Sequence, residues 1–312
     1  MKNKKIVVTG GAGFIGSNLA RHLSNGKNHV VVIDNLSTGH LENIQDLIAA
    51  EKVEFIKGSI TELNVLQDVF KGVDYVFHEA ALPSVPRSIK EPLLTNQVNI
   101  NGTLNVLVAA KDASIKKVIY ASSSSVYGDT PTLPKKESMT PNPLSPYTVS
   151  KLAGEYYCQV FTTAYGLPTV ALRYFNVYGP QQDPASEYAA VIPKFVTRVL
   201  NHQKIVIYGD GEQTRDFTFV ADVVRANILA AESKISGVFN AAGGKRITLN
   251  DLAQTIMMLC KNKVDIVYED VRPGDIKHSL ADISKAKKGF GYIPEYGINE
   301  GLKETIKWFQ KH

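Results

Sequence analysis

Residues 9–16 read Thr-Gly-Gly-Ala-Gly-Phe-Ile-Gly, and this stretch decides the fold. It follows the apolar, β-branched run Lys5–Thr9 and precedes residues 14–25, whose apolar side chains recur at helical spacing. Gly10 would permit a tight turn, Gly13 a close approach of the backbone to a pyrophosphate, and Gly16 close packing of the helix on the strand. A strand, a glycine-rich turn and a helix in this order predict a dinucleotide-binding unit with the anion at the helix N-terminus.

Short apolar runs alternate with helical patterns through the first half of the chain. The predicted strands after the first are residues 30–33, Val53–Lys57, Tyr75–His78 and 117–121, and the clearest helix between them is 96–114. Continuous apolar strands separated by helices are typical of a parallel sheet that is covered on both faces. The sequence therefore predicts an α/β protein with a Rossmann-type doubly wound sheet.

The pattern changes after Arg173. Turn signals fill residues 176–215, while residues 216–231 and 238–242 again predict a helix and a buried strand. We therefore expect a Rossmann domain formed by residues 1–175 and about 216–243. A smaller, discontinuous α/β domain of residues 176–215 and 244–312 would bind the substrate, with the active site in the cleft between the two.

Composition excludes several classes of protein. The 312 residues are 44% hydrophobic and 21% charged, which is typical of a globular chain and not of a disordered one. The net charge of +5 is dispersed, so we expect no nucleic-acid partner. Cys158 and Cys260 have neither disulfide-framework nor metal-site spacing, so we expect no bound metal and a reducing compartment. No signal sequence or membrane span is evident, and we expect a cytoplasmic protein without a membrane partner.

An acidic residue follows the second predicted strand. The Asp34 carboxylate would accept hydrogen bonds from ribose hydroxyls and repel a 2′-phosphate, and no Arg or Lys lies next to it in the sequence. This predicts NAD rather than NADP as the cofactor. Gly58, Ser59 and Ile60 follow the third strand, where the adenine should lie.

A second cluster of functional candidates combines Tyr147, Lys151 and the serine run 122–125. Ser145 and Pro146 predict a helix start, and the i, i+4 spacing places the phenol and the ammonium on one helix face. A nearby ammonium favours the phenolate, so we expect a lowered pKa for Tyr147 and a role as general base. The serine run ends the strand before this helix, and at least one of its hydroxyls should contact substrate.

These residues, with Leu-Arg-Tyr-Phe-Asn at 172–176, resemble the extended short-chain dehydrogenase/reductase family. Over essentially its full length the chain is similar to NAD-dependent nucleotide-sugar 4-epimerases, most of all to the UDP-N-acetylglucosamine 4-epimerase group. The longer motifs that carry this likeness are Ala-Ala-Leu-Pro-Ser-Val-Pro-Arg-Ser at 80–88, Ala-Ala-Val-Ile-Pro at 189–193, and Arg-Pro-Gly-Asp-Ile-Lys-His-Ser-Leu-Ala-Asp at 272–282.

The resemblance implies a mechanism and a set of site residues. Tyr147, with Ser123 in its proton network and Lys151 beside it, would remove the proton of the sugar 4-hydroxyl while hydride passes to tightly held NAD. The 4-keto sugar would turn about its linkage to the diphosphate and take the hydride back on its other face. The implied cofactor-binding set is Gly10, Gly13, Phe14, Ile15, Gly16, Asp34, Asn35, Ser37, Thr38, Gly39, Gly58, Ser59, Ile60, Ala80, Ala81, Asn99, Ala121, Tyr147, Lys151, Tyr174, Asn176 and Val177. The implied substrate-binding set is Ser84, Ser123, Ser125, Tyr147, Asn176, Ala190, Val191, Ile192, Tyr208, Arg215, Arg272, Asp275 and Ser279.

The same resemblance implies roles within the substrate set. Arg215 and Arg272 would pair with the diphosphate, since a guanidinium makes bidentate contacts with phosphate oxygens. Asp275 would meet the nucleotide ribose, and Tyr208 with residues 191–192 the uracil. Ser279 would stand beside the sugar C2 substituent, where a small side chain leaves room for an acetamido group. We therefore expect UDP-GlcNAc and UDP-GalNAc to be the substrates, with UDP-glucose and UDP-galactose as a second pair.

Other functions remain open at this stage. One alternative is a UDP-glucuronate 4-epimerase, which needs no further acid. A sugar-nucleotide dehydratase or decarboxylase would need a carboxylic acid where Ser124 and Ser125 stand, and a non-catalytic NAD sensor would have lost Tyr147 or Lys151. The family also implies a homodimer paired through helices, for which residues 96–114 and 146–164 are candidates.

Overall fold

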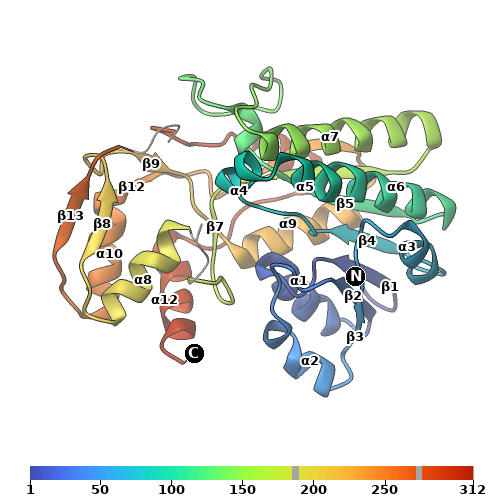
Figure 1. Cartoon of the computed structure of the whole chain (residues 1–312), viewed down its shortest axis with the longest axis horizontal. Helices are drawn as coiled ribbons and strands as arrows, with labels where there is room; N and C mark the ends of the chain where they lie inside the picture. The colour runs from blue at the N-terminus through green and yellow to red at the C-terminus, as the bar shows by residue number, and fades with distance from the viewer. Residues whose placement is uncertain (185–189, 272–275, 312) are drawn as a thin grey trace.

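Seven parallel strands form the central sheet (Figure 1). The structure is a computed structural model that describes residues 1–184, 190–271 and 276–311. The strands are β1 (Lys5–Thr9), β2 (His29–Asp34), β3 (Val53–Lys57), β4 (Tyr75–His78), β5 (Lys117–Ser123), β6 (Thr169–Tyr174) and β11 (Gly237–Ala241). Their order, β11-β6-β5-β4-β1-β2-β3, reverses direction between β1 and β4. This doubly wound arrangement confirms the predicted fold class and places the switch point beside the glycine-rich turn.

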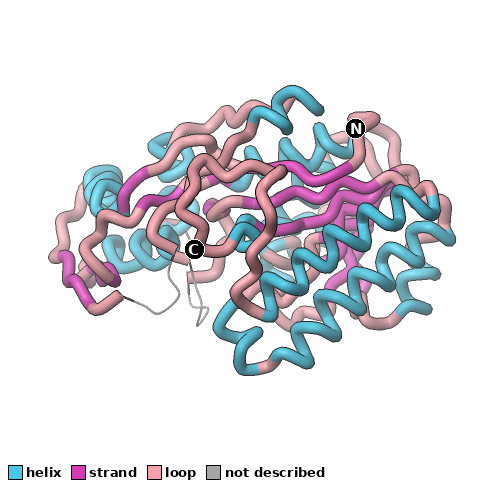
Figure 2. Tube along the Cα trace, turned by 90° about the horizontal axis from the view of Figure 1, so that it is seen from above, coloured by secondary structure: helices cyan, strands magenta, loops and turns pink. Residues whose placement is uncertain are grey.

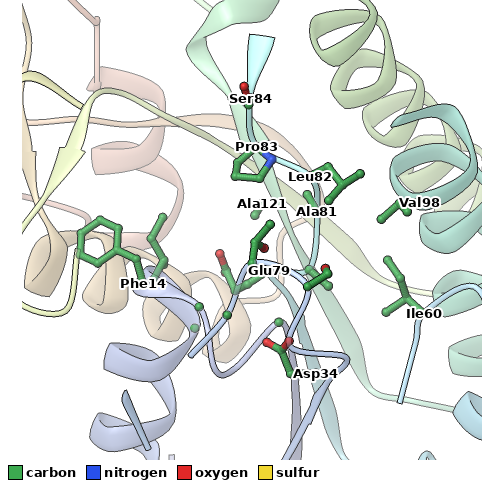
Figure 3. A pocket seen from close by; sticks show the side chains of 18 of the residues that line it. Phe14, Asp34, Ile60, Glu79, Ala81, Leu82, Pro83, Ser84, Val98 and Ala121 are labelled. Carbon is green, nitrogen blue, oxygen red and sulfur yellow. The ribbon is translucent and has the colours of Figure 1, made fainter. Parts of the chain in front are cut away.

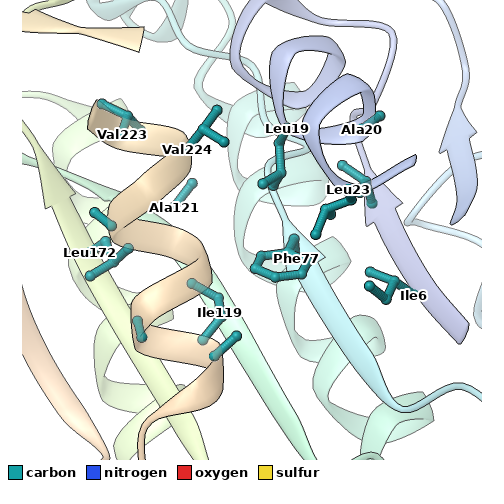
Figure 4. Packing of buried hydrophobic residues seen from close by; sticks show 14 of the residues in the cluster. Ile6, Leu19, Ala20, Leu23, Phe77, Ile119, Ala121, Leu172, Val223 and Val224 are labelled. Carbon is teal, nitrogen blue, oxygen red and sulfur yellow. The ribbon is translucent and has the colours of Figure 1, made fainter. Parts of the chain in front are cut away.

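Both faces of the sheet are covered by helices, and Figure 2 shows the strands lying between them. One face carries α1 (Phe14–Ser24), α9 (Val220–Glu232) and α11 (Ser284–Phe290), and the other carries α3 (Leu63–Val69), α6 (Gly102–Asp112) and α7 (Pro146–Tyr165). Side chains alternate between the two cores: Ile6 and Val8 pack with Leu19 of α1 (Figure 4), whereas Val7 belongs to the opposite cluster. The alternation explains why these strands are apolar throughout.

A smaller unit continues from the sheet and has its own core. It contains α8 (Val191–Leu200), α10 (Leu249–Cys260) and α12 (Ile298–Phe309), and the parallel pair β8 (Ile205–Tyr208) and β13 (Ile266–Glu269). Two short ladders accompany it, β7 (Val177–Tyr178) with β10 (Thr218–Phe219) and β9 (Thr214–Arg215) with β12 (Ile247–Thr248). α11 falls within the predicted smaller domain by sequence. Its Ala286 and Phe290 nevertheless pack into the core on the large sheet.

Two predicted helices differ from the observed ones. The helix predicted at 96–114 is part of a longer helical segment. In this segment a π-helical turn at Gln97–Asn101 joins α5 (Pro92–Asn96) to α6. The helix predicted to begin at residue 216 begins at Val220, because the buried Asp216 carboxylate accepts backbone hydrogen bonds from Gly243, Gly244 and Ala281. Because the Asp216 side chain is hydrogen-bonded to these loops, the helix does not begin at residue 216.

Two features are absent from the part of the chain that the structure describes. None of the helices there combines the length and apolar character needed to cross a lipid bilayer. Within the same ranges, His, Cys, Asp and Glu side chains form no group of three or more that could hold a metal ion.

Candidate active site

The glycine-rich turn joins β1 to α1 in a conformation that requires its glycines. Gly10 has φ +70°, and a Cβ atom there would lie 2.6 Å from the Ala80 Cα atom. A Cβ atom on Gly16 would lie 2.2 Å from the Gly10 carbonyl oxygen, so only glycine lets the helix sit this close. α1 then begins at Phe14 without a side-chain cap or an acidic residue in its first turn. Its first backbone N–H groups are therefore suited to an anion.

Asp34 lies at the carboxyl end of β2 beside this turn. Its Oδ2 accepts a hydrogen bond from the Ala12 N–H at 3.0 Å, and its Oδ1 accepts one from the Leu36 N–H at 2.8 Å. Each carboxylate oxygen keeps a second lone pair. The side chain is thus fixed as a hydrogen-bond acceptor at the rim of the cleft (Figure 3), as a ribose diol requires.

A cavity of about 850 Å³ follows the carboxyl ends of the strands from Asp34 to α7 (Figure 3). Most of the predicted cofactor-binding residues line it. They are Gly10, Gly13, Phe14, Ile15, Gly16, Asp34, Asn35, Ser37, Thr38, Gly39, Gly58, Ser59, Ile60, Ala80, Ala81, Ala121, Tyr147, Lys151 and Tyr174. Three predicted residues, Asn99, Asn176 and Val177, are not among those that line it.

Three hydroxyl groups form a chain between the start of α7 and the end of β5, and one of them, that of Tyr147, belongs to a residue that lines the cavity. Helix α7 begins as predicted, with the Ser145 side chain capping the Thr148 N–H and Pro146 in the first turn. This start directs Tyr147 towards the end of β5, where the phenol is hydrogen-bonded to Ser123. Ser123 Oγ in turn accepts a hydrogen bond from Ser125 Oγ at 2.9 Å. The chain connects the half-buried phenol of Tyr147 to two further groups that can pass or accept a proton.

Lys151 lies one helical turn from Tyr147 and is buried. Its Nζ donates to the Ala121 carbonyl oxygen at 2.8 Å and lies 5.2 Å from the centre of the Tyr120 ring. Burial lowers the pKa of Lys151 to about 8, and the Glu79 carboxylate opposes that shift. The ammonium is held by the end of β5 and is accessible to the cavity.

The predicted fall in the pKa of Tyr147 is not observed in this structure. Burial raises the pKa of the phenol above its ordinary value, and the hydrogen bond with Ser123 only partly offsets the rise. The Lys151 ammonium is directed at Ala121 and the Tyr120 ring, so desolvation outweighs its influence on Tyr147. Burial therefore favours the protonated phenol in this structure, and Tyr147 must give up that proton before it can accept one from another hydroxyl group.

The four serines of the run 122–125 separate into different roles. Ser122 Oγ donates to Glu155 Oε1 at 2.5 Å, and this carboxylate makes a bidentate pair with Arg173, Nε at 2.8 Å and Nη2 at 2.7 Å. Ser122 therefore supports the buried ion pair behind the site, whereas Ser123 and Ser125 belong to the hydroxyl chain.

The two asparagines predicted to line the site instead hold its backbone. Asn99 lies in the π-helical turn, where its Oδ1 accepts from the Leu82 N–H at 2.8 Å and its Nδ2 donates to the Ser150 hydroxyl at 3.0 Å. Asn176 Nδ2 donates to the Asp216 carbonyl oxygen at 2.9 Å. Asn99 thereby ties the segment after β4 to α7, which is a positioning contact and not direct lining.

The predicted substrate residues are divided between the two units. Ser84 and Ala190 line the cavity together with Tyr147. Five further predicted substrate residues lie in the smaller unit and in the segments that connect it to the sheet, and they do not line the cavity. They are Val191, Ile192, Tyr208, Arg215 and Ser279. Ser279 is half-buried, and its N–H donates to the Thr214 carbonyl oxygen at 3.0 Å. Arg272 and Asp275 lie outside the described residues.

Several residues that line the cavity were not predicted from the sequence. The most consequential is Glu79, which directly follows β4 and is half-buried. Its position at a strand end, one residue before the Ala80-Ala81 motif, was an available signal. Arg87, Lys90 and Glu91 line the cavity from α4 (Val85–Lys90) and the residue after it, and nothing in their spacing marks them as site residues.

The doubly wound sheet, the glycine turn and the Ser123, Tyr147 and Lys151 cluster define a Rossmann-fold enzyme of the short-chain dehydrogenase/reductase type. The chain belongs to the NAD dependent epimerase/dehydratase family, whose model matches residues 6–242.

Three known proteins show what the whole chain is similar to. The structure of a UDP-N-acetylglucosamine 4-epimerase from Methanobrevibacter ruminantium, in complex with UDP-N-acetylmuramic acid, is 50% identical, with a TM-score of 0.96 and coverage of 100% of this chain and 99% of that one. A UDP-glucose 4-epimerase from Thermotoga maritima with UDP-glucose is 38% identical, with a TM-score of 0.94 and coverage of 98% and 99%. A UDP-glucuronate 4-epimerase from Thermodesulfobacterium geofontis is 34% identical over 98% of this chain and 96% of its own length.

Membership of an NAD-dependent family makes NAD the cofactor of this cleft, and the residues present fit it. The uncapped N-terminus of α1 with its glycines suits the pyrophosphate, and the fixed Asp34 carboxylate suits a ribose diol. Lys151 offers an ammonium at the opposite end, near the tyrosine. A cavity of about 850 Å³ is large enough for a dinucleotide-sized ligand.

Proposed function

We propose that the protein inverts C4 of UDP-N-acetylhexoses, interconverting UDP-GlcNAc and UDP-GalNAc, and acts on UDP-glucose and UDP-galactose as a second pair. When bound, NAD supplies the redox chemistry by taking the hydride from C4 and returning it. The observation that carries the proposal is that Tyr147 and Lys151 line the cavity of an NAD-dependent epimerase family member, with Tyr147 joined to the Ser123 and Ser125 hydroxyls at the end of β5.

The chain's own residues supply reversible acid–base chemistry. Tyr147 takes the proton of the sugar 4-hydroxyl as the C–H bond is broken, and gives it back when the ketone is reduced from the other face. Burial raises the pKa of the phenol, which makes Tyr147 a weaker acid and its phenolate a stronger base, so the phenolate is suited to the first half of this cycle. Ser123 shares the proton, and Lys151 stabilises the negative charge that develops on the phenolate oxygen.

Two considerations support the N-acetyl sugars as substrates. Ser279, placed by the resemblance beside the sugar C2 substituent, and Ser84, which lines the cavity, are small side chains that leave volume for an acetamido group. The 50% identical relative is itself described as a UDP-N-acetylglucosamine 4-epimerase.

A second candidate is the epimerisation of UDP-glucuronate. Two cationic side chains, Arg87 and Lys90, line the cavity and could face a sugar carboxylate. Arg87 Nε, however, already pairs with Glu91 Oε2 at 3.0 Å, which reduces the net positive charge at that wall. Ser124 and Ser125 disfavour a dehydratase or decarboxylase, and the intact Tyr147 and Lys151 disfavour a non-catalytic sensor.

The homodimer implied by the family has a suitable surface. On α7, Val149, Tyr156 and Val160 are 47–54% exposed and lie on one helix face, at i, i+7 and i+11. Ile89 of α4 and Leu93 of α5, which are 64% and 86% exposed, extend this apolar face on the neighbouring helices. A second copy of the chain that pairs through α7 would cover these side chains.

One experiment separates the candidate functions. The purified protein is incubated separately with UDP-GlcNAc, UDP-glucose and UDP-glucuronate, and the products are identified by proton NMR of the sugar anomeric signals. Conversion of UDP-GlcNAc to UDP-GalNAc supports the proposal. Conversion of UDP-glucuronate alone supports the second candidate, and loss of water or carbon dioxide would overturn both.

A further inference from the structure

Glu79 is a half-buried carboxylate that lines the active-site cavity and has no part in the reaction described above. It follows β4 directly, and Figure 3 shows it among the cavity residues beside Ala121. The Tyr174 hydroxyl on β6 donates to Glu79 Oε1 at 2.8 Å. Asn227 Nδ2 of α9 donates to the same tyrosine oxygen at 2.8 Å, so the carboxylate is anchored by a chain that reaches across the sheet to α9.

The Glu79 carboxylate influences Lys151 without an ion pair between them. Lys151 Nζ is hydrogen-bonded to the Ala121 carbonyl oxygen, and Glu79 is bonded to Tyr174; among the described residues no direct salt bridge joins the two side chains. A direct salt bridge would occupy the ammonium's N–H groups. An offset carboxylate still lowers the free energy of the buried positive charge, and it leaves those N–H groups available to ligands.

We propose that Glu79 is a positioning residue of this active site, whose anchored carboxylate keeps the Lys151 ammonium charged while leaving its donors free for cofactor and substrate. The catalytic meaning of this role rests on the proposed epimerase function. A charged Lys151 is needed both to stabilise the developing phenolate and to donate to ligand hydroxyls, so losing its charge would impair both.

Other groups around Lys151 do not replace Glu79. Five other titratable side chains belong to the elements around it: His78 of β4, Tyr120 of β5, Tyr147 and Glu155 one turn before and after it on α7, and Tyr174 of β6, which is bonded to Glu79. Burial lowers the pKa of His78 to about 3, and burial raises the pKa of all three tyrosines, so these four groups are neutral near pH 7. Glu155 is committed to Arg173 by two hydrogen bonds.

The pKa directions agree with this assignment. Burial lowers the pKa of Lys151 to about 8, and the carboxylate of Glu79 is the one group that raises it. Burial raises the pKa of Glu79 to about 7, and Lys151 lowers it in return. Without the carboxylate, the pKa of Lys151 should fall further, and its charge would be lost within the neutral range.

The test measures the charge of Lys151 directly, without cofactor or substrate. The protein carries lysine labelled with ¹³C at Cε, and the Lys151 signal is assigned by its absence from Lys151→Met. Glu79→Gln, which keeps the shape and the acceptor for Tyr174, should lower the pKa of Lys151 by about one to two units. The matched control Glu91→Gln removes another carboxylate of the cavity wall, one that pairs with Arg87, and should leave this pKa in place.

A reciprocal measurement covers a variant that fails to fold. Because the coupling between two groups is mutual, Lys151→Met should raise the pKa of Glu79, observed through ¹³Cδ-labelled glutamate, by a similar amount. A shift below about 0.3 units in both measurements would overturn the proposal.

The pH dependence of kcat/KM then links the charge to the reaction. For Glu79→Gln, the fall in rate on the alkaline side should move to lower pH by the same amount as the pKa of Lys151. If Glu79→Gln shifts the pKa of Lys151 but leaves the pH dependence of kcat/KM unchanged, the role of Glu79 in the reaction is overturned. If the wild-type protein epimerises no UDP-sugar, the proposed function fails, while the NMR result still decides whether Glu79 holds the charge of Lys151.

Discussion

Replacing Tyr147 by phenylalanine removes a single oxygen atom from the centre of the proposed mechanism. The ring stays in its position on α7, and the hydroxyl chain loses one hydrogen bond, to Ser123. Losing a hydrogen bond of this kind costs about 0.5–1.5 kcal/mol of stability, which a folded domain can tolerate. The variant should therefore fold and bind NAD as the wild type does.

The expected effect of the same change on turnover is much larger. Removal of a general base lowers the rate by about 10²–10⁴, which corresponds to about 2.7–5.4 kcal/mol of activation free energy. Because the substitution leaves the cavity volume almost unchanged, the loss should appear in kcat and not in KM. The expected rise in activation free energy exceeds the expected loss of folding stability. A large loss of turnover in a folded variant therefore reports a chemical defect and not a folding defect.

The assay follows conversion of UDP-GlcNAc by anomeric NMR signals, and it measures NAD released on denaturation of the same samples. Tyr165→Phe is the matched control, since it removes the hydroxyl of a 57% exposed tyrosine at the end of the same helix. The control should retain wild-type turnover. A Tyr147→Phe rate within tenfold of wild type, with NAD still bound, would refute the assignment of the base.

Three further changes test cofactor choice, substrate choice and assembly. Asp34→Ala should weaken NAD binding and reduce the preference for NAD over NADP, because the acceptor for the ribose hydroxyls is lost. Calorimetry on the cofactor-free proteins measures the affinities for NAD and for NADP. Equal affinities for the two cofactors in the wild type would contradict the prediction. Ser279→Tyr should remove activity on UDP-GlcNAc and spare UDP-glucose, because the larger ring fills the space of the acetamido group; an equal loss on both substrates would show that this position does not select the sugar. Val160→Glu should convert a dimer to a monomer in light-scattering measurements, because an unpaired charge would be buried at the pairing face of α7, and an unchanged mass would exclude that face.

Much of the fold was predictable because backbone geometry and burial leave direct marks in the sequence. The glycines at 10 and 16 stand where a Cβ atom would collide with backbone atoms, so no other residue type is compatible with the turn. The strands β1 and β2 are buried on both faces, which requires continuous apolar runs. Ser145 and Pro146 marked the start of α7, and with it the place of Tyr147.

The remaining features depend on contacts between segments that are far apart in the sequence. Asn99 was expected in the cofactor site; in this structure its amide is hydrogen-bonded to the Leu82 backbone and to the Ser150 hydroxyl. Asp216 lies in an apolar-looking stretch that predicts a helix, yet its carboxylate is satisfied by loops from residues 243–244 and 281. The raised pKa of Tyr147 reflects burial, which i, i+4 spacing does not report.

The central claim is that this protein epimerises a UDP-sugar at C4 with NAD that stays bound. The most direct measurement incubates the purified protein, without added NAD, with UDP-GlcNAc in one tube and UDP-GalNAc in another, and follows both by NMR. The two tubes should reach the same mixture of the two sugars, with many turnovers per protein and no net formation of NADH. Absence of conversion from either side by NAD-containing protein, or a product that has lost water, would contradict it.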